Sequence, residues 1–393
     1  MRIALPPSTL GLFRDIFITV TLFALRKCMS YVNSIRVDTD PSKGLDYVEI
    51  ICDNDDNLAK CIAQYYNIKG AGNVLISSAS EFEEIMYKNW EFSFNETQHK
   101  WKISMGGKSF PIRKHSLYDY TKFFYARDPI SLIGRDERVR KGKVKPVSGF
   151  LDITIDNPLR SRVLWYLDKL ASSRVDMPGI RVHNYITASG IPSSLDVLEG
   201  YVSLLTSFIR ERETRAGIRL EITSMCRNVL STRMIQEDPD ILSKWFELTI
   251  LRKLLTEDVT ESILYLSPPI RVYGVAAGEA KRVLTFFEVD LSAIPRTRIA
   301  IDESAKRIGV STPTLVSVLS KSIEILAQLS SSGDEKVSLC AEALKPHLRI
   351  VLNSAFNGSL RPDTLYALVR YVSEASRTLA QFKNLVDVLS GLA

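Results

Sequence analysis

Residues 90–112, WEFSFNETQHKWKISMGGKSFPI, decide the fold class of the first part of the chain. Polar and apolar side chains alternate over 90–94 and again over 101–105, as in strands with one buried face. A polar turn separates these two runs, and the pair Gly106-Gly107 predicts a two-residue hairpin turn into a third strand over 108–112. The stretch therefore predicts a three-stranded antiparallel meander.

The residues before the meander mix helical and strand patterns. Ser8 is placed to cap an apolar helix over 10–31, and YVEIIC at 47–52 predicts a short strand. The acidic turn 53–57 has carboxylates that could ligate a divalent metal ion, but no distant ligand accompanies them, so we interpret it as the cap of a helix over 58–66. Ser80 and Glu83 predict a capping box for a further helix.

The pattern changes after residue 158. Helical spacing with capping residues or breakers between the segments predicts helices over 159–172, 193–213, 223–235, 239–256, 258–266, 301–308, 313–330, 335–354 and 362–390. The run at 283–289 is ambiguous but closer to a strand. We therefore expect an α+β protein, with a mixed N-terminal region that contains an antiparallel meander and an all-helical C-terminal half. The expected domains are 1–158, 159–270 and 271–393.

The composition of the 393 residues is that of a folded multi-domain protein. Hydrophobic residues make up 45% and charged residues 24%, which excludes fibrous and wholly disordered classes. The five cysteines contain no C-x-x-C pair, so we expect free thiols in a reducing cytoplasm rather than disulfides. Glutamine is scarce, which is a mild signature of growth at high temperature.

The longest apolar run, residues 16–25, lies between Asp15 and Arg26. A membrane-spanning helix needs about 20 apolar residues, so we expect a core helix here and no membrane partner. The flanking charges also do not match a secretory signal peptide.

Positive charge is concentrated in residues 101–145. This window holds 12 Lys or Arg against 4 acids, a net charge of +8, whereas the whole chain carries +6. Cationic side chains bind phosphate backbones with release of counterions, so the excess predicts nucleic-acid binding. The expected contacts are Arg113, Lys114, Lys122, Arg127, Arg135, Arg138, Arg140, Lys141, Lys143 and Lys145. A solvated loop next to a tyrosine-rich core helix is the alternative interpretation.

A second candidate site is the stretch IDESAKRIGVSTPTLVSVLS at 301–320. Ala305 and Gly309 have the spacing of a helix-turn-helix unit, and Ser311 or Thr312 can cap the second helix. The pieces AKRIGVST and TLVSVL resemble the helix-turn-helix of the LacI-type repressor family. That resemblance implies base contacts by Thr312, Thr314 and Ser317. It also implies phosphate contacts by Lys306, Arg307 and Lys321.

Two features weigh against this helix-turn-helix interpretation. Ser304 occupies a position that is usually apolar, and the second helix has few Arg, Asn or Gln residues to contact bases. An ordinary helix pair in a helical domain therefore stays open as the alternative.

No catalytic motif stands out. The four histidines are far apart in sequence, no G-x-S-x-G elbow is present, and the glycines at 274 and 278 lack the pattern of a phosphate-binding loop. We therefore expect a non-enzymatic protein with no cofactor and no metal site.

The layout of the chain resembles the large subunit of archaeal type I-A CRISPR effector (Cascade) complexes. The likeness consists of the opening LPPSTLGLFRDIF at 5–17, a basic mixed region and a helical C-terminal bundle. The resemblance implies a subunit for DNA target recognition in antiviral defence, with DNA, a guide RNA and other protein subunits as partners, the latter bound through the helical half. A sequence-specific helix-turn-helix protein of plasmid or viral replication or partition is one alternative. A structural assembly protein without nucleic acid is the other.

Overall fold

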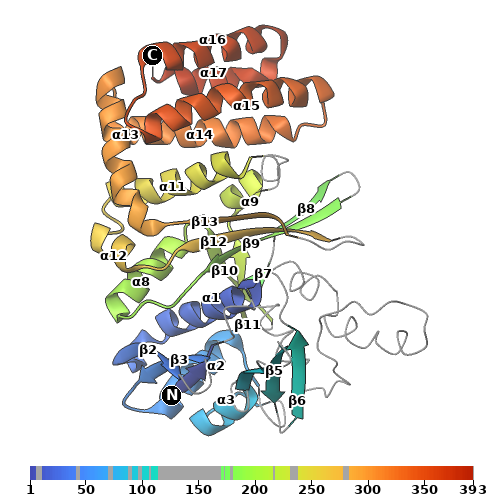
Figure 1. Ribbon diagram of the computed structural model, residues 1–393, viewed down its shortest axis with the longest axis vertical. Helices are drawn as coiled ribbons and strands as arrows, with labels where there is room; N and C mark the ends of the chain where they lie inside the picture. Colours follow the sequence, from blue (N-terminus) through green and yellow to red (C-terminus); the bar gives the residue numbers. More distant parts are fainter. Residues whose placement is uncertain are drawn as a thin grey trace, which may run out of the picture.

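The computed structural model describes residues 1–5, 11–40, 45–69, 74–86, 91–95, 100–105, 108–113, 170–171, 173–177, 180–215, 217–230, 238–277 and 283–392. Along its longest axis the molecule stacks an N-terminal unit, a four-stranded sheet and a C-terminal helical bundle (Figure 1). The expected α+β class is confirmed, with small antiparallel sheets mostly in the N-terminal half and helices in the C-terminal half.

The N-terminal unit contains a small antiparallel sheet and three helices, of which α2 packs against both α1 and α3. The strands β1 (Arg2–Ala4), β2 (Ser34–Asp40) and β3 (Leu45–Ile51) are ordered β1-β3-β2. The helices are α1 (Gly11–Lys27), α2 (Asp55–Tyr66) and α3 (Ala79–Met86). Helix α1 is the expected apolar helix, and residues 15–25 are all buried. It ends at Lys27, before a short 3-10 turn over Met29–Tyr31.

Side-chain caps fix where α2 and α3 begin. The Asn54 side chain accepts hydrogen bonds from the backbone N–H groups of Asp56 and Asn57, and Asp55 and Asp56 lie in the first turn of α2. Asp53 lies before the cap and accepts a hydrogen bond from Asn33 at 2.6 Å. Carboxylates are favourable there because the helix dipole is positive at its N-terminus. The turn therefore starts the helix as expected and two of its aspartates complement the dipole, but Asn54 rather than an aspartate supplies the cap, and the helix begins at Asp55 rather than at 58. The predicted cap of α3 is wrong, because Ser78 rather than Ser80 accepts the capping bond, from the N–H of Glu81.

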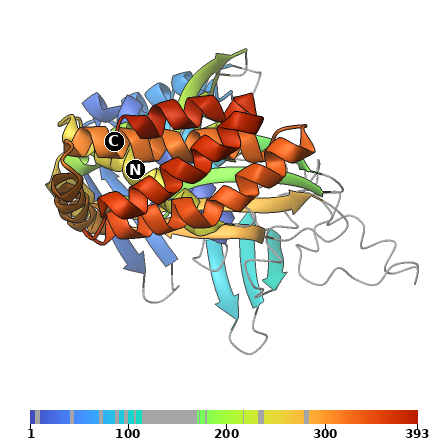
Figure 2. The ribbon, with the colours of Figure 1, turned by 90° about the horizontal axis from the view of Figure 1, so that it is seen from above.

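The predicted meander is present. Strands β4 (Glu91–Asn95), β5 (Lys100–Met105) and β6 (Lys108–Arg113) pair antiparallel in chain order. Figure 2 shows these strands extending outward from the body of the molecule. The strand that we expected over 151–155 lies outside the described residues.

The central sheet has the order β13-β12-β9-β8 and is antiparallel throughout. Its strands are β8 (Ser173–Met177), β9 (Ile180–Ala188), β12 (Ile270–Ala277) and β13 (Val283–Val289). Helix α1 packs against β9, and α11 (Pro239–Leu255) packs against β13 (Figure 1). The sheet therefore joins segments about 90 residues apart in sequence. The expected boundary between residues 270 and 271 falls at the start of β12.

A second small sheet corrects one helix prediction. The helix expected over 193–213 ends early, as α8 (Leu195–Leu205), and is followed by β10 (Ile209–Thr214) and β11 (Gly217–Ile222). Strand β11 also pairs in parallel with β7 (Leu170–Ala171), where a helix was expected. Arg and Glu are good helix formers, so the run IRERET favoured a helix locally, but pairing with β11 overrides that preference.

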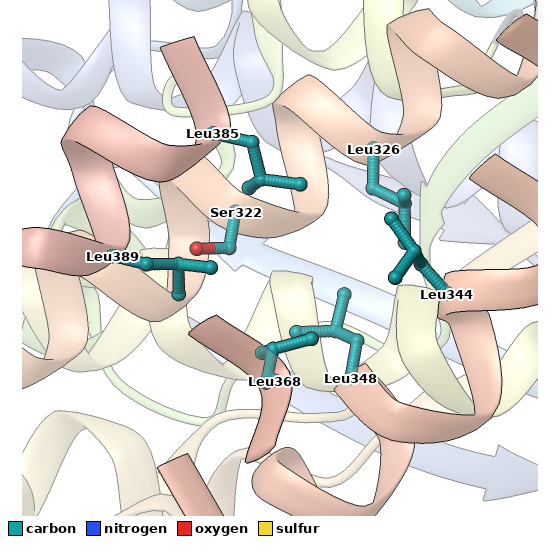
Figure 3. A pocket seen from close by; sticks show the side chains of 7 residues that line it. All are labelled: Ser322, Leu326, Leu344, Leu348, Leu368, Leu385 and Leu389. Atoms are coloured by element: carbon teal, nitrogen blue, oxygen red, sulfur yellow. The ribbon is translucent and has the colours of Figure 1, made fainter. Parts of the chain in front are cut away.

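The C-terminal bundle follows β13 and a 3-10 turn over Leu291–Ala293. Its helices are α13 (Ile294–Ile308), α14 (Thr312–Ser330), α15 (Glu335–Phe356), α16 (Pro362–Thr378) and α17 (Lys383–Ser390), with a 3-10 turn over Ala380–Phe382. The short helices α9 (Ser224–Leu230) and α12 (Glu261–Leu266) lie at its base. Leucines of α14, α15, α16 and α17 enclose a cavity of about 10 Å³ beside Ser322 (Figure 3).

The cysteine prediction is wrong for two of the five residues. Cys28, which follows α1, and Cys61 of α2 are bonded, with sulfurs 2.12 Å apart. The other three cysteines are free thiols. No sequence pattern indicated this pair, because its members are 33 residues apart and only the packing of α2 on α1 brings them together.

An ionic cluster connects α1 to the central sheet. Asp15 is fully buried and accepts hydrogen bonds from the Tyr273 hydroxyl at 2.5 Å and from Arg271 at 3.3 Å. Arg271 also donates to Glu288 on the neighbouring strand. Burial raises the pKa of Asp15 to about 6, although the bonds from Tyr273 and Arg271 favour its charged form.

Candidate nucleic-acid interface

The register of the meander separates cationic from apolar residues. Lys100 lies opposite Arg113 on β6 and Asn95 on β4, and Lys102 lies opposite Ser93 and Pro111. Residues directly opposite each other share a face of a sheet, and alternate residues along a strand share it too. The positions of Lys100, Lys102 and Arg113 therefore share one face, together with the position of Glu91, which lies opposite Ser104.

The other face of the meander carries the large apolar residues. Its members are Phe92, Phe94, Trp101, Ile103, Phe110 and Ile112, together with Lys108 at the end of β6.

Most of the basic segment lies outside the described residues. Arg113 is the last residue of β6, and the next described residues are those of β7, which pairs with β11 through Leu170 opposite Leu220. The remaining predicted phosphate contacts lie outside the described residues; they are Lys114, Lys122, Arg127, Arg135, Arg138, Arg140, Lys141, Lys143 and Lys145. Of the predicted set, the structure thus places only Arg113, at the edge strand of the meander.

The helix-turn-helix stretch has the local geometry that its sequence predicts. Helix α13 ends at Gly309, whose φ of 77° lies in the left-handed region that favours glycine. The Ser311 side chain then accepts a hydrogen bond from the N–H of Thr314 and caps α14. Thr312 and Pro313 form the first turn of that helix.

The residue that departs from the helix-turn-helix pattern has a structural role. Ser304 is fully buried, its hydroxyl donates to the carbonyl of Ala355 at 3.0 Å, and it accepts from the N–H of Leu360 at 3.5 Å. These bonds hold α13 against the C-terminal end of α15. An apolar residue at this position would remove the hydrogen-bond acceptor of the buried Leu360 N–H, whereas the Ala355 carbonyl would keep the N–H of Gly358.

Helix α14 is the central helix of the bundle. It contacts α9, α11, α13, α15 and α17, and most of its side chains are buried. Thr314 and Lys321 are exposed and Ser317 is half-buried, so the predicted contacts form one narrow polar stripe. The placement favours the interpretation as an ordinary helix pair, because a helix that reads the major groove needs an open face. Base reading by Thr312, Thr314 and Ser317 stays a prediction.

The charge at this turn is partly neutralised. Asp302 accepts a hydrogen bond from Thr312 at 2.6 Å and pairs with Lys306 at 2.5 Å. The bond from Lys306 lowers the pKa of Asp302, and the same pair raises the pKa of Lys306. Lys306 is thus held by a carboxylate, whereas Arg307 and Lys321 are exposed. This surface is less cationic than its sequence indicates.

Sequence reasoning missed a charged hairpin, because β10 was assigned to a helix. Arg210 and Arg212 of β10 both donate to Glu221 of β11, at 3.3 and 3.0 Å. Burial opposes ionisation of Glu221, but the two arginines outweigh it and lower its pKa. The alternation of Arg and Glu over 210–213 was the signal that could have indicated an exposed ribbon.

The described residues contain neither a metal-ligand cluster nor a membrane-spanning helix. Among them no three His, Cys, Asp or Glu side chains are grouped so as to hold a metal ion. None of the helices in the same ranges is both long and apolar enough to cross a bilayer.

Comparison of the chain with models of known protein families, with curated proteins and with solved structures found no match. The case for a nucleic-acid interface therefore rests on the charge of residues 101–145 and on the strand register of the meander alone.

Proposed function

We propose that the chain is a non-enzymatic nucleic-acid-binding subunit of a multi-protein complex. The observation that carries the proposal is the register of the meander, which gathers Lys100, Lys102 and Arg113 on one face. The cationic excess of residues 101–145 begins on this sheet and continues beyond it. Phosphate backbones bind such surfaces through counterion release, without a catalytic group.

The resemblance to the large subunit of type I-A CRISPR effector complexes supports a narrower form of this proposal. In that form the chain helps to recognise target DNA beside a guide RNA, and the bound strands run along the cationic face and the basic segment. The contacts are to phosphate and sugar, so they position the nucleic acid rather than read its sequence.

A triple variant of the meander tests the proposal. We expect K100A/K102A/R113A to weaken binding to single-stranded DNA, duplex DNA and RNA alike. The slope of log K against log salt should fall by about 2 to 3, since each phosphate contact contributes up to about 0.9. Fluorescence anisotropy over a salt series measures both effects.

The matched control removes the same charge elsewhere. K60A/K336A/K383A neutralises three exposed lysines on α2, α15 and α17, and we expect affinity and slope to stay near those of the unchanged protein. If both triple variants weaken binding equally, the effect is one of net charge and the proposed face is wrong. If the unchanged protein binds no nucleic acid even at low salt, it is an assembly protein instead.

A second comparison separates backbone binding from sequence reading. Replacing Arg138, Arg140, Lys141 and Lys143 by Ala should weaken all nucleic acids by a similar factor. Replacing Thr314 and Ser317 by Ala should leave every affinity unchanged. A change in preferred DNA sequence in the latter variant would favour the repressor-like alternative instead.

A further inference from the structure

Helix α15 is apolar on two opposite faces. One face packs into the bundle through Val337, Ala341, Leu344, Leu348, Val351, Leu352 and Ala355. The opposite face carries Leu339, Ala343, Pro346 and Ile350, all exposed, with Leu339 62% and Ile350 55% accessible. An outer helix of a globular bundle normally carries charged or polar residues on this side.

The spacing of the exposed residues indicates what fits them. Leu339, Ala343, Pro346 and Ile350 follow one another at intervals of four, three and four residues. This is the a/d repeat of a helix that packs along another helix. The small side chain of Ala343 in the middle of the row leaves room for a neighbouring side chain. The surface therefore fits a helix, rather than an extended strand or a small molecule.

The borders of this row are charged on one side and aromatic on the other. Glu342 and Arg349 lie on the first border and are seven residues apart, which is one heptad. His347 lies on the second border and stacks on Tyr371 of α16, with ring centroids 4.2 Å apart. Tyr371 is itself 45% exposed, so the apolar surface continues from α15 onto α16.

These borders are complementary to themselves in one orientation. When two copies of α15 run antiparallel, Leu339 of each copy lies opposite Ile350 of the other, and Ala343 lies opposite Pro346. The same alignment places Glu342 of each copy beside Arg349 of the other, because antiparallel helices pair these flanking positions with one another. A parallel pairing would place Pro346 on Pro346 and leave both charges without an opposite partner.

We propose that α15 is a homotypic docking helix, on which a second copy of this chain packs antiparallel through Leu339, Ala343, Pro346 and Ile350 with two Glu342–Arg349 pairs between the copies. The inference does not depend on the proposed nucleic-acid binding. A homotypic contact of this kind is isologous and closes at two copies.

Both charged residues can serve the second copy without losing their own contacts. Arg349 binds the buried Asp238, but a guanidinium has five donors and can bind a second carboxylate. The Glu342 side chain is 28% exposed and pairs with Lys345 through Oε2. A carboxylate oxygen can accept a second hydrogen bond, so Oε2 can also receive a guanidinium of the other copy.

The mass of the full chain over a concentration series tests the proposal. We expect light scattering and sedimentation to show a monomer–dimer equilibrium, and L339E/I350E to raise the dissociation constant at least about tenfold, a change of about 1.4 kcal/mol. The matched control is I299E on α13, where the isoleucine is 63% exposed and lies outside the proposed seam. A monomer at every concentration, or an equal effect of I299E, would overturn the proposal.

A charge exchange identifies the occupant. The single variants E342R and R349E each place like charges across the seam, so each alone should dimerise more weakly than the unchanged chain. Mixed together, the two variants should form a heterodimer with restored affinity. The two arginines at 342 and 349 of one copy then face the two glutamates at 349 and 342 of the other. Circular dichroism of each variant checks that it is folded. If the folded variants do not restore one another on mixing, the seam belongs to a different partner and the homotypic proposal is wrong.

Discussion

The junction between α1 and the central sheet and the interior of the C-terminal bundle both have buried centres, but different groups fill them. At the junction Asp15, Arg271 and Tyr273 form a hydrogen-bonded ionic cluster, and the Cys28–Cys61 bond lies at the end of the same helix. The bundle interior is leucine-rich around a small cavity. Polar and covalent links depend on pH and redox state, whereas apolar packing depends on volume, so the two regions should respond to different perturbations.

The largest expected effect is in the bundle. Leu348→Ala enlarges the existing cavity beside Ser322, and we expect it to lower the free energy of unfolding by about 3 to 5 kcal/mol, because both transfer and cavity terms are lost. Urea unfolding measures it. Leu266→Ala, at a leucine 62% exposed on α12, is the control and should change stability by less than about 0.5 kcal/mol. Similar losses for the two variants would contradict the assigned packing.

The disulfide should respond to reductant where the bundle does not. We expect dithiothreitol to lower the unfolding free energy of the N-terminal unit by about 2 to 4 kcal/mol, because opening the bond frees a loop of 33 residues in the unfolded chain. A Cys28→Ala/Cys61→Ala variant should have the stability of the reduced protein, and dithiothreitol should not lower it further. Alkylation of both thiols in the native protein without reductant would show that the bond does not form.

The junction should also respond to pH. The folded pKa of Asp15, about 6, lies above the ordinary value of 3.8, so the folded protein holds this proton more tightly than the unfolded chain does. The stabilisation is complete below pH 3.8 and is lost as the pH rises through 6. We expect this to amount to at most about 3 kcal/mol.

Unfolding measured from pH 4 to 7 in Asp15→Asn checks this prediction. The variant removes the titration, so its stability should depend less on pH than that of the unchanged protein. Asp363→Asn, at an exposed position of α16, should keep the original dependence. An unchanged slope in Asp15→Asn would show that Asp15 does not titrate in this range.

The smallest effects compare two buried serines within the bundle. Ser304 connects α13 to the end of α15, so Ser304→Ala should cost about 1 to 3 kcal/mol, because the buried N–H of Leu360 loses its acceptor. The Ser322 hydroxyl donates only to Val318 of its own helix, so Ser322→Ala should be neutral or stabilising by less than about 1 kcal/mol. Thermal unfolding of the two variants measures the contrast, and equal losses would contradict it.

Local sequence patterns predicted the structure correctly where a segment makes its hydrogen bonds with residues close to it in sequence. The alternation of 90–112 with its Gly-Gly turn predicted the meander, and the caps predicted α11 and α14 to within about one residue. The central sheet was largely missed, since β9 and β12 are far apart in sequence and neither alternates clearly. The run at 283–289 was ambiguous for the same reason until its pairing with β12 was known.

At the candidate sites too, local geometry could be predicted from the sequence, whereas the surroundings of each site could not. Gly309 and Ser311 predicted a helix-turn-helix geometry, which the structure has, but not that five neighbouring elements would surround α14. For the basic segment, charge counts indicated the excess, and only the strand register placed Lys100 and Lys102 on the same face as Arg113. The exposed row on α15 was hidden in the sequence, because that helix has apolar residues on both sides.

The amino-acid order by itself determined the class of the fold, the cap of α14, the meander and the place of the positive charge, because these depend on neighbours within a few residues or on composition alone. Tertiary structure decided which strands form the central sheet, which cysteines bond, why Ser304 is polar and which side of α15 stays open. Those features depend on contacts between segments distant in sequence, and such contacts form only when the whole chain buries its apolar surface.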